Sequence, residues 1–159
     1  MFLVIDSPIG PLRLEACADG LVSVTWSHLP TPTSSSSTTA KGRRALRQGA
    51  AWLAAYFKGQ AVPDRLPPLS FSGTPFQKAV WRWLLALPPG KTTTYGEIAR
   101  GVRRPGASRA VGQAVGANPI PILVPCHRVL AAGGKLGGYS AGLRRKRWLL
   151  AHEGLAARA

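Results

Sequence analysis

Residues 122–130 read ILVPCHRVL and place a cysteine, a histidine and an arginine side by side in an apolar segment. A cysteine in such a setting is usually inert and packs as a small hydrophobic residue. The neighbours of Cys126 favour chemistry instead, because Arg128 can stabilise a thiolate and His127 can remove the thiol proton. Adjacent side chains do not face each other, so Cys126 and His127 need a turn or a bridging water to cooperate. The segment therefore predicts either a buried structural cysteine or an activated nucleophile.

A histidine that acts as a base needs a third group to orient its ring. Residues 70–159 contain two acidic side chains, Glu97 and Glu153. Glu97 follows Thr94 by three positions, and this spacing is typical of a capping box at the start of a helix. Glu153 is therefore the predicted orienting group for His127.

A metal site is the alternative use of these residues. The possible ligands are Cys17, His28, His127 and His152, which are scattered and lack the spacing of a zinc site. The glycine-rich loop near residues 131–142 has no phosphate-binding pattern. Its glycines indicate either a mobile loop or a loop whose backbone approaches a ligand closely. We therefore expect no metal and no cofactor.

The charge of the chain is strongly positive and unevenly distributed. The 159 residues include 21 Lys and Arg against 6 Asp and Glu, for a net charge of +15. Residues 1–69 carry 7 basic and 4 acidic side chains, whereas residues 70–159 carry 14 and 2. Such a field attracts polyanions, which makes nucleic acid the first candidate partner. Two cysteines, no visible signal peptide and no long apolar run predict a cytoplasmic protein without a membrane segment.

Turn signals and periodicity predict an α+β protein with two domains. Residues 1–69 form the first, with three short strands (2–6, 11–16 and 21–26), a flexible loop (30–41) and an amphipathic helix (42–59). The predicted apolar stripe of that helix consists of Leu46, Ala50, Leu53 and Phe57. The Pro-rich stretch 61–69 is the predicted domain boundary.

Residues 70–159 predict a mostly helical second domain of the helix-turn-helix, winged-helix-like type. Thr74 and Gln77 form a capping box for a helix whose core stripe is Phe76, Val80, Trp83, Leu84 and Leu87. A short helix beginning at Thr94 is broken by RRPG, and a second begins near residue 107. An ordinary helical hairpin would show the same pattern, but the basic charge favours DNA binding.

The segments SRAVGQAVGAN, NPIPIL, PCHRV and GGYSAG…LLAHEG together resemble the O6-alkylguanine-DNA alkyltransferases, densely from Gly73 to Gly154. The resemblance implies that Cys126 accepts an alkyl group from guanine O6 once, irreversibly. It also implies that His127 deprotonates Cys126 through water, that Glu153 orients His127, and that Asn118 positions the site.

The same resemblance implies roles in binding the flipped base. Tyr95 would donate toward N3 of guanine, the Ser140 backbone would donate to O6, and Tyr139 would lie beside the alkyl group. The carbonyls of Cys126 and Val129 would accept from the exocyclic amine. Contacts to DNA are implied for Arg109, as an inserted finger, and for Ala110, Gly112 and Gln113.

Two departures from the family pattern carry expectations of their own. Ala141 replaces the glycine of GGYSGG and would narrow or stiffen the pocket. Some members hold a zinc ion in the N-terminal domain, which Cys17 and His28 alone cannot supply.

The expected partner is double-stranded DNA containing O6-alkylguanine, with O4-alkylthymine as a further candidate, bound by a protein that is monomeric when free. Two rival functions remain at this stage. One is a non-catalytic helix-turn-helix protein that binds lesions, and the other is a Cys–His hydrolase acting on a small substrate.

Overall fold

The computed structural model describes residues 1–28, 33–34 and 39–157, in two compact units, Met1–Ser72 and Gly73–Ala159. Among these residues, no helix is both long and apolar enough to cross a membrane. The α+β class predicted from the sequence is confirmed.

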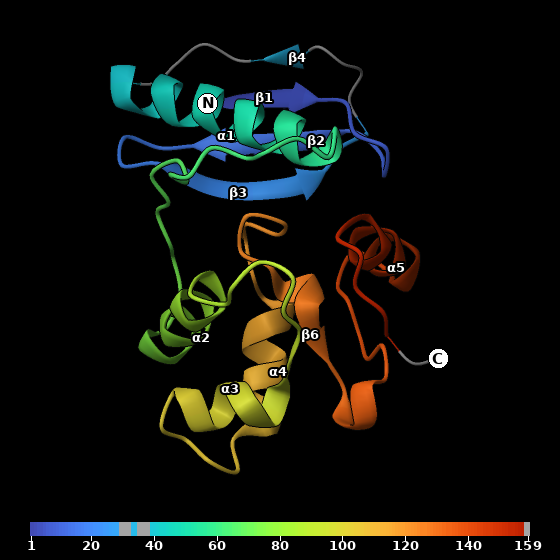
Figure 1. The fold of residues 1–159 in the computed structure, drawn as a ribbon. Helices are drawn as coiled ribbons and strands as arrows, with labels where there is room; N and C mark the ends of the chain where they lie inside the picture. The colour runs from blue at the N-terminus through green and yellow to red at the C-terminus, as the bar shows by residue number, and fades with distance from the viewer. Residues whose placement is uncertain (29–32, 35–38, 158–159) are drawn as a thin grey trace. The chain divides into compact units, whose positions relative to one another are not determined.

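The N-terminal unit is built on an antiparallel sheet of order β3-β2-β1-β4 (Figure 1). Its three main strands, β1 (Phe2–Ile5), β2 (Leu12–Ala16) and β3 (Leu21–Trp26), confirm the predicted strands. The prediction of a loop over 30–41 is wrong at residues 33–34 and 40–41. Strand β4 (Thr33–Ser34) pairs with β1 and covers its edge, and a helix begins at Ala40. The rest of that predicted loop, residues 30–32 and 35–38, lies outside the described residues.

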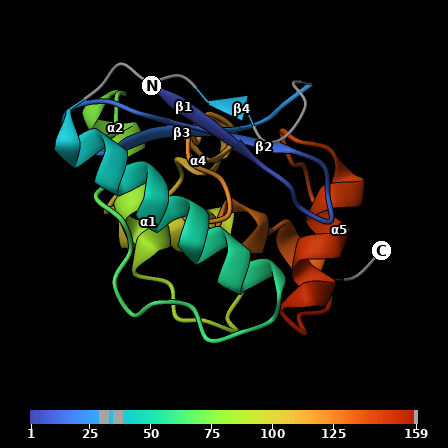
Figure 2. The ribbon, with the colours of Figure 1, turned by 90° about the horizontal axis from the view of Figure 1, so that it is seen from above.

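Helix α1 (Ala40–Phe57) runs along one face of this sheet (Figures 1 and 2). Leu46 and Leu53 are buried as predicted, whereas Ala50 and Phe57 are only partly buried. The buried face instead includes further residues, namely Gly42, Ala45, Gly49, Trp52 and Tyr56. Contact is closest at Gly49, where an added Cβ would lie 2.6 Å from Leu21 Cδ1. This close approach sets which face of the helix the sheet covers.

The Pro-rich stretch 61–69 lies within the N-terminal unit, Met1–Ser72. The backbone of Leu21 accepts from Ser70 N at 2.7 Å and donates to the Pro68 carbonyl at 2.8 Å. The chain therefore stays attached to β3 up to residue 70, and the division between the units falls after Ser72.

The C-terminal unit begins with α2 (Pro75–Leu85), and the predicted Thr74–Gln77 capping box is present. Val80 and Leu84 are buried as predicted, but Phe76, Trp83 and Leu87 are only partly buried. Trp81, absent from the predicted stripe, is buried, and its Nε1 donates to the Ala114 carbonyl at 2.8 Å.

Two short helices then form the predicted helix-turn-helix. Helix α3 (Tyr95–Gly101) starts with the Thr94–Glu97 capping box, and α4 (Ser108–Gly116) packs against α2 and α3. The rest of the unit consists of β5 (Thr93–Thr94) parallel to β6 (Val129–Leu130), the 3-10 turns η1 (Cys126–Arg128) and η2 (Ala132–Gly134), and α5 (Leu143–His152). In Figure 1, β6 lies between α4 and α5.

Gly101 is the point where α3 approaches α2 most tightly. A Cβ at this position would lie 1.9 Å from Nε1 of Trp83, so Gly101→Ala forces the indole to move. We expect Gly101→Ala to lower the free energy of unfolding by about 1–3 kcal/mol, measured by denaturant titration. Gly96→Ala in the same helix is the control, because its nearest neighbours are 3.7 Å away or more and alanine favours helices. Equal stability of the two variants would contradict this contact.

Candidate active site

Cys126 opens the turn η1 at the end of a continuous buried segment, and only 4 % of its surface is exposed. Asn118 braces this segment, because its Nδ2 donates to the Val124 carbonyl and its Oδ1 accepts from Ile120 N, both at 3.0 Å. Between these contacts Ile122 has a φ of 76°, a left-handed conformation that a β-branched residue rarely adopts. The brace holds a strained turn immediately before the cysteine, the kind of strain that occurs at functional sites.

His127 is completely buried and bonds to Glu153, with 2.5 Å between Nε2 and Oε1. An ionised carboxylate only accepts hydrogen bonds, so this pairing assigns the ring proton to Nε2. The other nitrogen, Nδ1, is buried and has no hydrogen-bond partner among the described atoms. Burial lowers the pKa of His127, although Glu153 opposes this, and the ring is therefore a neutral base with a free lone pair.

The sequence suggested that Arg128 stabilises the Cys126 thiolate, but in the structure Arg128 pairs with Glu153. Its Nε donates to Glu153 Oε2 at 2.7 Å, so the two oxygens of one carboxylate hold His127 and Arg128. Because Arg128 is paired in this way, its contact helps to fix the carboxylate for His127.

The thiol of Cys126 is a protonated group at rest, because burial raises its pKa. Hydrogen bonds from Asn118 and Tyr139 and the positive charge of Lys146 oppose this shift. Sequence reasoning missed Lys146, which belongs to the run RRKR and resembles a solvated charge cluster. One signal was available, since Lys146 precedes the buried Leu149 and Leu150 by three and four residues, on one helix face.

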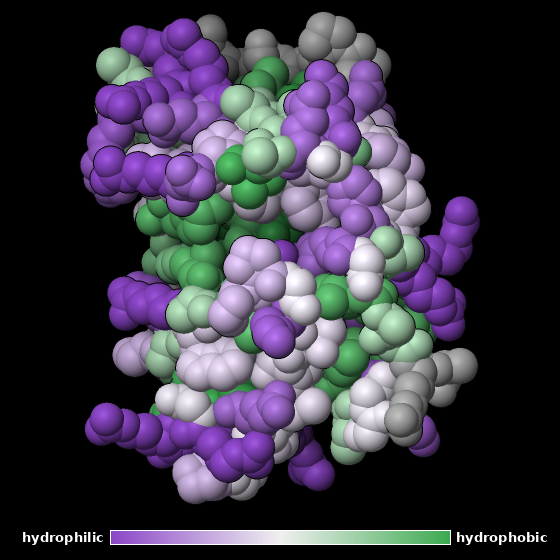
Figure 3. Space-filling model, viewed as in Figure 1, coloured by the Kyte–Doolittle hydropathy of each residue, from purple (hydrophilic) through white to green (hydrophobic). Residues whose placement is uncertain are grey.

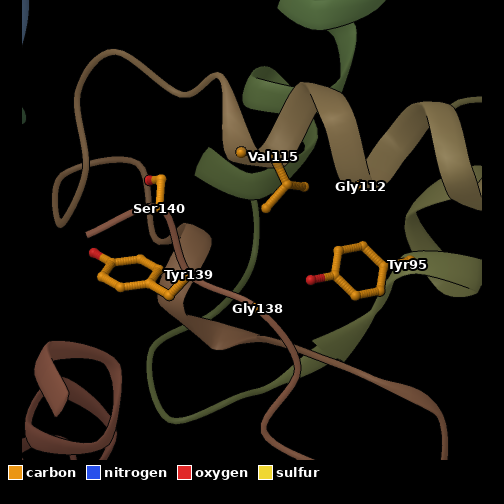
Figure 4. Close-up of a pocket in the computed structure, with 7 residues that line it drawn as sticks. Tyr95, Gly112, Val115, Gly138, Tyr139 and Ser140 are labelled. Carbon is orange, nitrogen blue, oxygen red and sulfur yellow. The ribbon is translucent and has the colours of Figure 1, made fainter. Parts of the chain in front are cut away.

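A pocket of about 170 Å³ opens in the C-terminal unit (Figure 4). Its walls come from α3, from α4 and from the loop before α5, and its lining residues are Tyr95, Gly112, Val115, Gly116, Gly138, Tyr139 and Ser140. A cavity of about 150 Å³ can hold a benzene ring, so this one accepts a flat group of comparable or larger size. The pocket thus brings together three residues that the sequence assigned to base binding, Tyr95, Tyr139 and Ser140.

Tyr95 reaches into the pocket from α3, with its hydroxyl directed toward the loop at Gly138 (Figure 4). Burial, and next the charge of an ionised Cys126, raise the pKa of Tyr95. The hydroxyl therefore remains protonated and can donate to a group in the pocket. Cys126 is not among the lining residues, but it interacts with two of them, Tyr139 and Tyr95.

Two other predicted residues have different surroundings from those expected. The Val129 carbonyl already accepts from Lys146 Nζ at 2.6 Å, although a carbonyl has a second lone pair. Ala141 is not among the lining residues, and its carbonyl accepts from Arg145 at 3.0 Å. Ala141 therefore does not narrow the pocket directly in this structure, and the expectation that it stiffens the pocket stays a prediction.

The predicted DNA contacts share the outer side of α4. Arg109, Ala110 and Gln113 are exposed, while Gly112 is partly buried at the pocket wall. Hydrophilic side chains project from the C-terminal unit around α3 (Figure 3), where Arg100, Arg103 and Arg104 are exposed. In the described part of the chain, no group of three metal-binding side chains occurs.

The C-terminal unit thus holds a buried cysteine, a bonded His127–Glu153 pair and a helix-turn-helix, and comparisons with known proteins identify the family. Residues 75–155 match the model of the 6-O-methylguanine DNA methyltransferase, DNA binding domain, and residues 2–71 match the 6-O-methylguanine DNA methyltransferase, ribonuclease-like domain. The chain belongs to the 6-O-methylguanine DNA methyltransferase family.

Relatives of known name support this assignment over nearly the whole chain. The methylated-DNA–protein-cysteine methyltransferase of Methanosarcina acetivorans is 42% identical over 155 residues, which cover 96% of this chain and 97% of that protein. The protein of the same name from Mycobacterium tuberculosis is 44% identical and covers 94% of this chain and 89% of its own length. The crystal structure of Mycobacterium tuberculosis OGT in complex with DNA matches with a TM-score of 0.81 and 43% identity, covering 96% of this chain and 91% of that one.

Proposed function

We propose that this protein repairs O6-alkylguanine in double-stranded DNA by transferring the alkyl group to its own Cys126. The observation that carries the proposal is a buried thiol with a histidine–glutamate relay, next to a base-sized pocket on the helix-turn-helix. Membership of the family and the DNA complex of the Mycobacterium tuberculosis relative support it.

The reaction begins with extrusion of the damaged base, because O6 is not accessible to a thiol within the stacked duplex. Extrusion costs roughly a few kcal/mol, and in this proposal the exposed Arg109 fills the vacated space. The exposed, small side chains of α4 permit close approach to the minor groove. Tyr139, Ser140 and Tyr95 then surround the base in the pocket.

Transfer is a single displacement at the alkyl carbon. The Cys126 thiol proton passes through a water to Nδ1 of His127, and Glu153 stabilises the imidazolium. The sulfur then forms a bond to the alkyl carbon while the bond from that carbon to guanine O6 breaks. Guanine leaves as an anion that Tyr95 stabilises by donating toward N3, and the Ser140 backbone donates to O6.

The product is a thioether, which no residue of the site is placed to cleave, so each molecule acts once. The N-terminal unit, residues 1–72, supports the acceptor unit in this proposal. Free Cys17 and Cys126 suit a reducing, cytoplasmic compartment, and we propose that the protein acts there as a monomer.

Mass spectrometry of the intact protein tests the proposal. Incubation with duplex DNA containing O6-methylguanine is expected to add one methyl group per molecule, located at Cys126 by peptide mapping. Methylation should reach the amount of protein present and then stop. Unmodified Cys126 and intact lesions after long incubation would support the non-catalytic DNA-binding alternative, whereas repeated turnover would support a hydrolase.

Arg109 provides a test of base extrusion. Arg109→Ala is expected to slow transfer from duplex DNA by about tenfold or more, because the cavity left by the base is unfilled, without affecting transfer from free O6-benzylguanine. Single-turnover rates with both substrates measure the difference. The control is Arg82→Ala, which removes the same charge from the exposed face of α2. If Arg109 only contacts phosphate, both substrates will react at wild-type rates at saturation, and the salt dependence of binding will fall by a slope of about 1.

A further inference from the structure

Lys146 is the least expected buried group in the structure. It has no exposed surface, although lysine is almost never fully buried unless it is paired. It lies on α5 within a run of basic residues, while its neighbours Arg144 and Arg147 are exposed. The proposed reaction assigns it no role.

The ammonium group of Lys146 joins two segments that are distant in sequence. Its Nζ donates to the Val129 carbonyl at 2.6 Å and to the Gly138 carbonyl at 2.9 Å. Val129 begins β6, directly after the turn that carries Cys126, and Gly138 is part of the pocket wall. One side chain therefore holds the wall of the pocket at a fixed position relative to the acceptor turn.

Lys146 also carries a buried charge that acts on the Cys126 thiol. Among the described charged groups near Cys126, Arg128 is paired with Glu153, whereas the contacts of the Lys146 ammonium are to uncharged carbonyls. Its charge favours ionisation of Cys126, and an ionised Cys126 favours the charged form of Lys146. Burial lowers the pKa of Lys146 to about 8, so it remains mostly protonated near neutral pH.

We propose that Lys146 is a positioning residue for alkyl transfer, which clamps the pocket wall to the acceptor turn and balances the negative charge that forms on Cys126. This inference rests on the proposed function of Cys126. The Val129 carbonyl is also an expected acceptor for the guanine amine, and the clamp leaves one of its lone pairs available. Lys146 thus fixes the direction of that carbonyl as well as the charge opposite the sulfur.

Other titratable groups surround this position and bear on any pH dependence. Lys146 lowers the pKa of His127, and its charge is lost as the pH rises through about 8. Three elements around Lys146 carry charged or titratable groups. These are Cys126, His127 and Arg128 on η1, Tyr139 on the loop before α5, and Arg145 and Glu153 on α5 and at its end.

Single-turnover transfer from free O6-benzylguanine, measured across pH, tests this role without DNA binding. We expect Lys146→Met to lower the saturating rate near neutral pH by about tenfold or more, because the thiolate forms less readily and the wall is released. The midpoint of the rate profile should move to higher pH, which a loss of stability alone would not cause. Lys146→Gln retains hydrogen-bond donors without the charge, and its midpoint should move in the same direction. Arg147→Met, which removes an exposed charge from the same helix, should retain the wild-type rate and midpoint.

A folded Lys146→Met or Lys146→Gln protein with the wild-type midpoint would overturn the proposal, whereas failure of the wild-type protein to react would overturn the proposed function. The protonation state of Lys146 can also be measured in the wild-type protein, by nitrogen NMR of labelled lysine. The Lys146 signal should be that of a protonated, slowly exchanging ammonium near neutral pH. A neutral amine at that pH would likewise overturn the proposal.

Discussion

Replacement of Cys126 by serine is expected to abolish alkyl transfer and leave DNA binding intact. A serine hydroxyl ionises far less readily than a thiol, so the same relay cannot supply a comparable nucleophile. We expect the transfer rate to fall by about 10³-fold or more, as for removal of a nucleophile in other enzymes. Affinity for duplex DNA should change little, because Cys126 is only 4 % exposed and serine has nearly the same size. Mass spectrometry of the protein and fluorescence titration of labelled duplex measure the two quantities.

Cys17→Ser is the matched control, since it makes the same chemical change at the other cysteine of the chain. Burial is not the main influence on Cys17, whose pKa is lowered chiefly by a hydrogen bond from the Asp19 backbone. A pKa lowered in this way makes Cys17 the more ionised thiol, yet transfer should still be directed to Cys126 by the pocket. An alkyl group found on Cys17 in either variant would contradict the assignment of the acceptor.

The parts of the fold that were predicted correctly depend on contacts between near neighbours in the chain. Thr74 with Gln77 and Thr94 with Glu97 form capping boxes within four residues, so their residue types alone identify where two helices begin. The buried faces were less predictable. Trp81 is buried through a bond to a carbonyl 33 residues away, which no local pattern indicates.

In the candidate site, too, contacts between residues distant in the sequence were the ones that the sequence did not predict. Proximity in the sequence suggested Arg128 as the cation beside Cys126, but Glu153 engages it from a helix 25 residues further on. The residue that does carry charge toward the thiol, Lys146, reaches Cys126 only because α5 packs on η1. The pairing of His127 with Glu153 was predictable because residues 70–159 contain only two acidic side chains. Once Glu97 is assigned to its capping box, Glu153 is the one that remains, and its position in space is not needed to choose it.

These contacts change the account of how the nucleophile is activated. The sequence favoured a thiolate held by cationic neighbours, whereas burial keeps the Cys126 thiol protonated at rest. In the proposed mechanism ionisation then accompanies the reaction, and we expect the relay to control much of the rate. The relay is therefore the part of the site where a one-atom change is expected to have the second largest effect.

Glu153→Gln is expected to slow transfer by about 10²- to 10⁴-fold, within the range known for loss of a base or of its orienting group. The reason lies in the second partner of the carboxylate. Arg128 is a donor only, so it requires an oxygen at the position of Oε2, and the glutamine amide nitrogen must then face Nε2 of His127. That nitrogen donates, which moves the ring proton to Nδ1 and removes the lone pair that should accept the thiol proton.

The pH profile distinguishes this mechanism from a loss of stability. In the wild-type protein the lowered pKa of His127 keeps the base neutral from mildly acidic pH upward, so the rate should be nearly constant from there to about pH 8, where Lys146 begins to lose its charge. In Glu153→Gln the thiolate must form without the base, and the rate should rise steadily with pH above neutrality. Glu97→Gln is the control, because glutamine can also complete the capping box of α3 and the position is outside the site. A folded Glu153→Gln protein with the rate and flat profile of the wild type would exclude Glu153 from the proton path and leave His127 to act without it.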